Sequence, residues 1–208
     1  MDRQIMLQFK SFTGGFFETN CFLVEAPGGK VLFDAPEGAD AEFADEKIGL
    51  LVLTHGHWDH TADAAAIQRR HGCPVACHPE TVPMVAEEDF FERSGFPLRI
   101  KTLQPDRMMA EGQGQDFLGL KLDVLEVPGH CPGSLCFHAP EHGVLIGGDV
   151  LFSGGVGRSD LPGGDGDLLR RGIQQKILTL PDATVVLPGH GPATTVGEEK
   201  ASNPFVRG

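Results

Sequence analysis

Four residues of metal-binding type lie within six positions of the chain: His55, His57, Asp59 and His60. Two imidazoles two residues apart on an extended loop point the same way, so His55 and His57 can hold one metal ion. Asp59 and His60 fall on the following turn and can reach a second ion. With only nine histidines among 208 residues, this run favours a metal site over a solvated loop in which Asp59 merely caps a helix.

Three further residues complete the set later in the chain: His130, Asp149 and His190. Each histidine follows a Pro-Gly pair, and alone it would be typical of an ordinary turn. With the first run, however, the seven residues divide into two sets of three, with one carboxylate left to bridge. The expected sets are His55, His57 and His130 for one ion and Asp59, His60 and His190 for the other, with Asp149 between them. Both ions keep positions open for solvent, as a catalytic site requires.

These residues all follow strand-like segments, which must position them. The segments are residues 50–53 before His55, 120–127 before His130, 144–146 before Asp149, and 184–187 before His190. Loops at strand ends are where α/β folds collect their chemistry. Pro-Gly-His occurs twice, at 128–130 and 188–190, where Pro and Gly stop the strand and turn the chain. We therefore expect the ligands to meet at one sheet edge.

The rest of the chain predicts short strands and helices in one α/β domain spanning residues 1–208. Further strands are expected at 6–12, 21–25, 30–33, 74–77, 134–138 and 143–148, and helices at 62–70, 82–91 and 168–178. Residues 20–34 predict a hairpin around Pro27-Gly28-Gly29, and the apolar run 50–53 predicts a strand buried on both faces. The pattern is weak over 80–115. No repeat and no linker divides the chain.

Composition narrows the function classes. Acidic residues outnumber basic ones 29 to 17, for a net charge of −12, which argues against nucleic-acid and polybasic membrane-surface binding. No apolar run has the roughly 18 residues of a membrane span, and the N-terminus has no signal-like apolar stretch. Five cysteines, an odd number, predict free thiols in a reducing cytoplasm. Tyrosine is absent, so a mechanism that needs a phenol is excluded.

The ordered ligand set resembles that of the metallo-β-lactamase fold family. Pro-Gly-His-Cys-Pro-Gly-Ser at 128–134 and Pro-Gly-His-Gly-Pro at 188–192 resemble its glyoxalase II branch. Segments 157–164 and 198–205 look like the short bacterial members, and the match extends over residues 20–206. The resemblance implies an αββα sandwich, with two mixed β-sheets face to face and helices outside.

The resemblance also implies a reaction. Two divalent ions, Zn²⁺ by default with Fe or Mn as alternatives, would share a water of lowered pKa, and the hydroxide would attack a thioester such as S-lactoylglutathione. We assign the orientation of that hydroxide to Asp59 and Asp149. Two alternatives remain: a persulfide dioxygenase with one iron, which would leave His60 and His190 without metal, and a metal-dependent lactonase, whose relatives tend to use a tyrosine. The oligomeric state is left open.

Several residues have weaker interpretations. Arg158 lies where the family has a basic residue, and it predicts either a carboxylate clamp for the substrate or a loop-stabilising contact. The longer relatives hold glutathione with a C-terminal extension and tyrosines that this sequence lacks. Ser134 has no free histidine base, which argues against a serine hydrolase. Core positions are expected for Cys73 and Cys77. Cys131 is expected to point away from the site, Phe16, Phe17, Phe90 and Phe91 to be core or pocket wall, and His71, His138 and His142 to be surface or turn residues.

Overall fold

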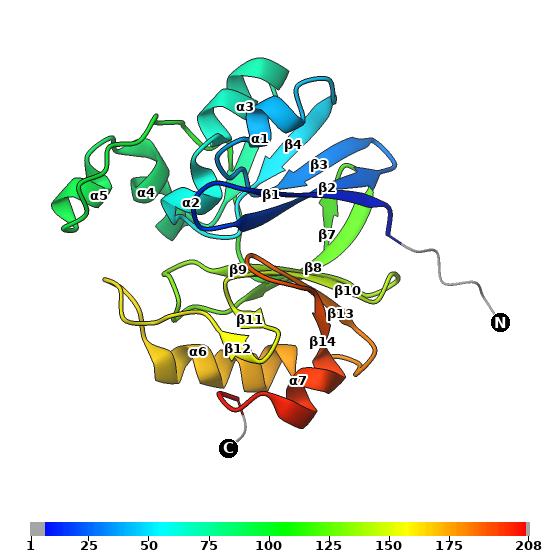
Figure 1. Ribbon diagram of the computed structural model, residues 1–208. Helices are drawn as coiled ribbons and strands as arrows, with labels where there is room; N and C mark the ends of the chain where they lie inside the picture. Colours follow the sequence, from blue (N-terminus) through cyan, green and yellow to red (C-terminus); the bar gives the residue numbers. More distant parts are fainter. Residues whose placement is uncertain (1–6, 207–208) are drawn as a thin grey trace.

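Two six-stranded sheets pack face to face, with helices on both outer surfaces, in the computed structural model, which describes residues 7–206 (Figure 1). Helices α1 (Ala39–Glu42) and α3 (Ala64–His71) lie outside the first sheet, and α6 (Gly166–Gly172) and α7 (Val196–Ser202) lie outside the second. This arrangement confirms the expected αββα sandwich. At one side, α2 (Trp58–Thr61), α4 (Val82–Ala86) and α5 (Phe90–Arg93) extend beyond the sheets.

The first sheet has its strands in sequence order. They are β1 (Phe9–Gly14), β2 (Thr19–Ala26), β3 (Gly29–Phe33), β4 (Ile48–Val52), β5 (Val75–Cys77) and β6 (Arg107–Met108). β1, β2 and β3 pair antiparallel, and β3 to β6 pair parallel. The predicted 20–34 hairpin is confirmed in β2 and β3. The expected strand at 6–12 appears as β1, and Met6 lies outside the described residues.

The second sheet has the order β14-β13-β10-β9-β8-β7. Its strands are β7 (Gly112–Phe117), β8 (Leu120–Glu126), β9 (Leu135–Ala139), β10 (Val144–Gly148), β13 (Val185–Pro188) and β14 (Thr194–Thr195). The β10–β13 pair is parallel and the other pairs are antiparallel. A small hairpin of β11 (Leu151–Phe152) and β12 (Gly155–Val156) follows β10. All four expected strands of this half are present.

Three apolar layers result from strands that are buried on both faces. Leu50 and Val52 of β4 belong to the core between the sheets, whereas Leu51 and Leu53 pack under α1 and α3. The third layer lies between the second sheet and α6. The run 50–53 is thus buried on both faces, as predicted, because a parallel strand between two layers has no solvent face.

Some local predictions were wrong. The expected helix 82–91 breaks at Glu87, whose backbone is extended, and it resumes as α5. The break lets Phe91 pack beside Met84 in a separate apolar cluster, and this burial outweighs helix continuity. His138 is not a surface residue: it lies buried on β9, with Nδ1 3.8 Å from Asp123 Oδ2. β7 and α7 fell in segments where no element was expected.

Candidate metal centre

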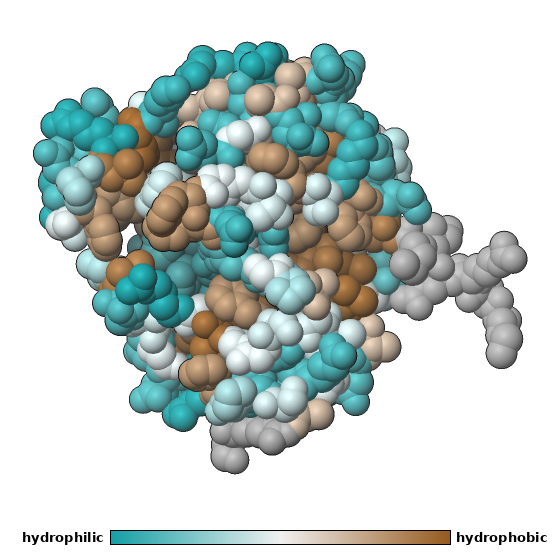
Figure 2. All heavy atoms as spheres, viewed as in Figure 1, coloured by the Kyte–Doolittle hydropathy of each residue, from teal (hydrophilic) through white to brown (hydrophobic). Residues whose placement is uncertain are grey.

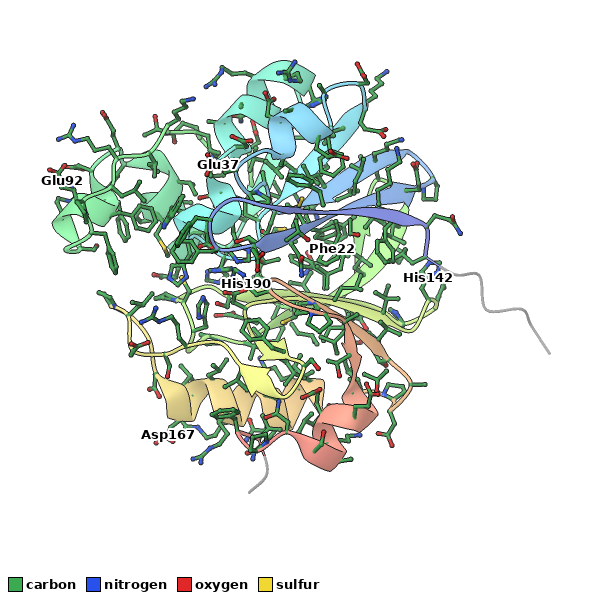
Figure 3. All side chains as sticks on the ribbon, viewed as in Figure 1. Phe22, Glu37, Glu92, His142, Asp167 and His190 are labelled. Carbon is green, nitrogen blue, oxygen red and sulfur yellow. The ribbon has the colours of Figure 1, made fainter. Side chains whose placement is uncertain are left out.

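All seven predicted ligands meet at one edge of the sandwich, where the two sheets come together. His55, His57, Asp59 and His60 follow β4 of the first sheet; His130, Asp149 and His190 follow β8, β10 and β13 of the second. Figure 3 shows His190 at this junction. The ligand atoms form three compact groups, each with its atoms within 4.8 Å of one another. The groups are His55, His57 and His130; His55, His60 and Asp149; and Asp59, His60 and His190.

Asp149 lies between the two histidine sets. Its Oδ1 is 3.2 Å from His60 Nε2, and its Oδ2 is 3.3 Å from His190 Nε2 and 3.5 Å from His130 Nε2. One carboxylate therefore faces donor atoms of both expected sets. This is the position that the sequence pattern predicts for a bridging ligand.

Hydrogen bonds on the outer side of the rings fix which nitrogen faces the centre. Nδ1 of His130 donates to the carbonyl of Arg158 at 2.7 Å, and Nδ1 of His190 donates to the carbonyl of Phe17 at 2.9 Å. A carbonyl can only accept, so in both rings Nδ1 carries a proton and Nε2 is the nitrogen that faces the centre. The chain thus prepares these imidazoles as ligands.

Asp34 orients two more histidines. Its Oδ2 accepts from Nδ1 of His60 at 2.8 Å and from Oγ1 of Thr54 at 2.7 Å. Since that hydroxyl gives its proton to Asp34, its lone pair is free to accept from Nδ1 of His55, 3.0 Å away. Asp34 and Thr54 are both buried. Sequence reasoning missed both residues, although Asp34 directly follows a strand and Thr54 directly precedes His55.

Burial sets the charge state of the first set. It lowers the pKa of His55 well below its usual value, lowers that of His57 to about 4 with help from His130, and lowers that of His130. All three imidazoles are therefore neutral at pH 7. Neutral imidazole is the form that binds a metal ion.

The residues of the second set, by contrast, are charged: the pKa values of its histidines are raised and that of its aspartate is lowered. Burial would lower the pKa of His60, but the carboxylates of Asp149 and Asp34 raise it well above its usual value. Against burial, hydrogen bonds to Asp149 and Asp59 raise the pKa of His190 to about 10. Burial favours protonation of Asp59, yet its contacts with His190 and His60 hold its pKa at about 2. These residues form a pocket that demands positive charge between them.

Two buried atoms show that a cation fits here. Among residues 7–206, neither His60 Nε2 nor Asp149 Oδ1 has a hydrogen-bond partner, although the two atoms lie 3.2 Å apart. Because Nδ1 of His60 donates to Asp34, Nε2 is left facing the carboxylate oxygen, and a positive charge must lie between the two atoms, either a proton on Nε2 or a metal ion in its place. Five imidazoles and two carboxylates are the ligand types of zinc, iron and manganese.

The two Pro-Gly-His turns need glycine for close packing. A side chain at Gly189 would put its first carbon 2.2 Å from Asp149 Oδ1 and 2.6 Å from His60 Cε1. At Gly129, where φ is +126°, the same atom would lie 2.4 Å from the backbone nitrogen of Leu169. Glycine therefore lets each turn approach its neighbours closely enough to present His130 and His190.

A cavity of about 520 Å³ opens directly onto these ligands. Arg158 lines it, but its guanidinium makes two hydrogen bonds of 2.8 Å to the carboxylate of Asp160. Its use as a clamp for a substrate carboxylate stays a prediction. Cys131 was expected to point away from the site, and this was wrong: it lines the cavity, with Sγ 3.7 Å from Met84 Sδ, because the 128–134 loop turns it inward.

Comparison with known proteins decides the family. The sequence model of the metallo-beta-lactamase superfamily matches residues 14–190, which include all seven predicted ligands. The chain belongs to the metallo-beta-lactamase superfamily. In this superfamily, the His/Asp cluster implies a divalent metal site and a metal-dependent enzyme.

Other superfamily members agree closely with the chain. It is 38% identical to the hydroxyacylglutathione hydrolase GloC of Haemophilus influenzae, over 79% of each chain. The crystal structure of the BLEG-1 B3 metallo-beta-lactamase superposes with a TM-score of 0.87 at 31% identity, covering 97% of this chain and 100% of that one. The structure of TTHA1623 in a di-iron-bound form gives a TM-score of 0.81 at 36% identity, with 94% and 99% covered.

The remaining predictions concern the cysteines and membranes. All five cysteines are free and buried, and Cys73 and Cys77 lie in the core as predicted. Over residues 7–206, no helix is long and apolar enough to cross a bilayer. The hydroxyl of Ser134, which was not expected to act as a nucleophile, donates to the backbone carbonyl of Cys131 at 2.8 Å.

Proposed function

We propose that this superfamily member is a binuclear metal-dependent thioester hydrolase of the glyoxalase II type. The observation that carries the proposal is the second ligand set: Asp59, His60 and His190 are assembled as compactly as the first set, with Asp149 between them. In a mononuclear iron site, by contrast, His60 and His190 would bind no metal. The similarity to GloC, named a hydroxyacylglutathione hydrolase, supports the thioester as substrate. A small-molecule substrate, with no nucleic acid or membrane partner, fits the net charge of −12.

The metal ions and the residues around them have separate roles in the proposed reaction. When bound, two divalent ions, which we expect to be Zn²⁺ with Fe or Mn as alternatives, supply Lewis acidity and lower the pKa of a shared water. Asp59 and Asp149 stay ionised at pH 7, so both can accept a hydrogen bond from the attacking water and orient it. Thr19 Oγ1 donates to Asp59 Oδ2 at 2.8 Å and holds that carboxylate in place.

Metal content and thiol release on the same preparation test this proposal. We expect about two metal ions per chain and release of glutathione from S-lactoylglutathione or a simpler thioester. In His57→Ala, thiol release should fall to background, because the first set loses a nitrogen. His71→Ala, at the end of α3, is the matched control and should keep full turnover.

The alternatives give different results in the same experiment. One iron per chain, oxygen uptake with glutathione persulfide and no thiol release would overturn the hydrolase and establish the dioxygenase. Turnover of a lactone with none of any thioester would establish the lactonase. Retention of metal and activity in His190→Ala would refute the binuclear centre.

A further inference from the structure

The cavity beside the metal centre has a polar floor and apolar walls. Its floor consists of ligands: His57, Asp59, His130, Asp149 and His190. Its walls are almost entirely apolar: Phe17, Trp58, Met84, Phe90, Phe91, Phe96, Cys131, Pro132, Leu161 and Pro162. Figure 2 shows hydrophobic side chains around a hollow on the side where α4 and α5 extend. A volume of about 520 Å³ suits a small-molecule substrate with one sizeable group inside.

Two pairs of aromatic rings line the cavity. The rings of Phe17 and Trp58 meet edge to face with centroids 5.7 Å apart. Those of Phe90 and Phe91 meet in the same way at 5.4 Å. Phe17 is 51% exposed and Phe96 is 39% exposed, which is unusual for side chains of this size. Exposed aromatic side chains around a cavity gain free energy when an apolar group covers them.

Charged groups are scarce in the same walls. Besides the metal ligands, the lining residues with polar side chains are Ser94 and Arg158. Arg158 is engaged by Asp160 through both of its hydrogen bonds, so this pair offers no net positive charge. A peptide thiol such as glutathione has two free carboxylates, which bind well where cations replace their water. Within residues 7–206, the walls supply no such pair of cations.

We propose that this cavity selects thioesters by an aromatic or branched apolar group, carried by the acyl or the thiol part, and gives no recognition to a charged peptide thiol. The inference rests on the proposed function for the reaction and adds the substrate class. Burial of a benzyl-sized group should strengthen binding about 10- to 100-fold. The peptide part of a glutathione thioester should contribute almost nothing.

Tryptophan fluorescence gives a readout of binding that does not depend on turnover. Trp58 is the single tryptophan of the chain, tyrosine is absent, and Trp58 lines the cavity. Three thioethers that cannot be hydrolysed would be titrated into the metal-loaded protein: S-benzylglutathione, benzyl methyl sulfide and S-methylglutathione. We expect the two benzyl compounds to quench Trp58 with dissociation constants within about threefold, and S-methylglutathione to bind about 10- to 100-fold more weakly. Equal binding of S-methylglutathione and S-benzylglutathione would overturn the inference, as would failure of benzyl methyl sulfide to bind.

Two variants place the binding in the cavity. Phe90→Ala removes a wall and should weaken both benzyl compounds about tenfold. Phe205→Ala is the matched control, since Phe205 is likewise partly exposed but lies outside this cavity, and it should leave binding unchanged. Equal effects of the two variants would refute the site.

The binding pattern and turnover can fail separately. Benzyl-dependent binding without hydrolysis of any thioester would refute the proposed reaction alone. Efficient hydrolysis of S-lactoylglutathione together with tight binding of S-methylglutathione would refute the apolar selection alone.

Discussion

One buried carboxylate, Asp34, connects the two ligand sets. It accepts directly from His60 of the second set, and through the hydroxyl of Thr54 it fixes the ring of His55 in the first. It also accepts from the backbone N–H of Thr54 at 2.8 Å, so the start of the ligand loop is anchored to the same group. A change at this residue should therefore affect both ions, although Asp34 itself need not touch either of them.

Substitution Asp34→Asn tests this role. Asp34 has φ +61°, a left-handed conformation that Asn also tolerates, so the backbone should be kept. The amide replaces one acceptor oxygen with a donor, which leaves His60 or Thr54 without its partner. We expect metal affinity to fall about 10- to 100-fold for both ions, measured by competition with a chelator. Asp182→Asn is the control, since the Asp182 side chain is exposed and pairs with Lys200 on the surface; equal affinity in the two variants would exclude the role.

Glycine in the second Pro-Gly-His turn makes a second prediction at the residue scale. In Gly189→Ala, the added methyl group meets Asp149 Oδ1 and His60 Cε1 closer than atoms can approach, so these two ligands must shift. We expect metal content to fall by at least half. Gly147→Ala, on β10 nearby, is the control: its methyl group would meet Val186 Cγ1 at an ordinary 3.4 Å. The metal content of both purified variants is measured by elemental analysis. Full metal loading of Gly189→Ala would contradict the packing argument.

At the scale of the elements, the strand ends could be predicted and the cavity wall could not. Apolar runs such as 50–53 define buried strands, and a ligand that directly follows such a run must lie at the sheet edge. The Asp34–His60 contact joins residues 26 positions apart, and only the pairing of β3 with β4 brings them together. The α4–α5 wall comes from a segment with weak periodicity, whose shape depends on the burial of Phe91. The spacing of apolar residues along one segment does not reveal which of them will be buried against a distant part of the chain.

Glu46 links two strands of the first sheet, the edge strand β1 and the inner strand β3, and gives a pH-dependent prediction. It pairs with Lys10 of β1 and Lys30 of β3, and these hydrogen bonds lower its pKa to about 2. Since the pKa is lower in the folded protein than the usual 4.5, the stabilisation is fully present above pH 4.5 and is lost as the pH falls towards 2. Because Lys10 is 63% exposed, solvent screening limits the contribution to about 1 kcal/mol.

Urea unfolding of Glu46→Gln at several pH values measures this contribution. The free energy of unfolding should be about 1 kcal/mol lower than in the unmodified protein at pH 7, and the difference should shrink between pH 4.5 and 3. Glu141→Gln, in the exposed turn between β9 and β10, should show no difference at either pH. A constant difference down to pH 3 would mean that shape rather than charge is responsible.

At the scale of the whole molecule, the centre joins the two halves of the sandwich. The first half supplies four of the predicted ligands from one loop, and the second supplies three from separate strand ends. Backbone hydrogen bonds cross the same edge. The N–H of Asn20 donates to the carbonyl of Gly189 at 2.7 Å, and the N–H of Leu135 donates to the carbonyl of Thr54 at 2.8 Å. Bound ions would add bonds to this junction. Their positive charge would also replace the protons of His60 and His190 beside the carboxylates of Asp59 and Asp149.

Removal of metal should therefore destabilise the entire fold rather than the loops alone. Ions that bind only the folded chain stabilise it by about 4 kcal/mol at a free concentration 1,000 times the dissociation constant. For a domain of this size, that corresponds to a fall in Tm of about 10 °C when a chelator is added. Calorimetry with and without chelator measures it, with His57→Ala expected to show a reduced shift and His71→Ala the full one. If the metal-depleted protein, verified by metal analysis, unfolds at the same temperature as the loaded one, then protein contacts such as Asn20–Gly189 hold the junction alone and the ions serve only the reaction.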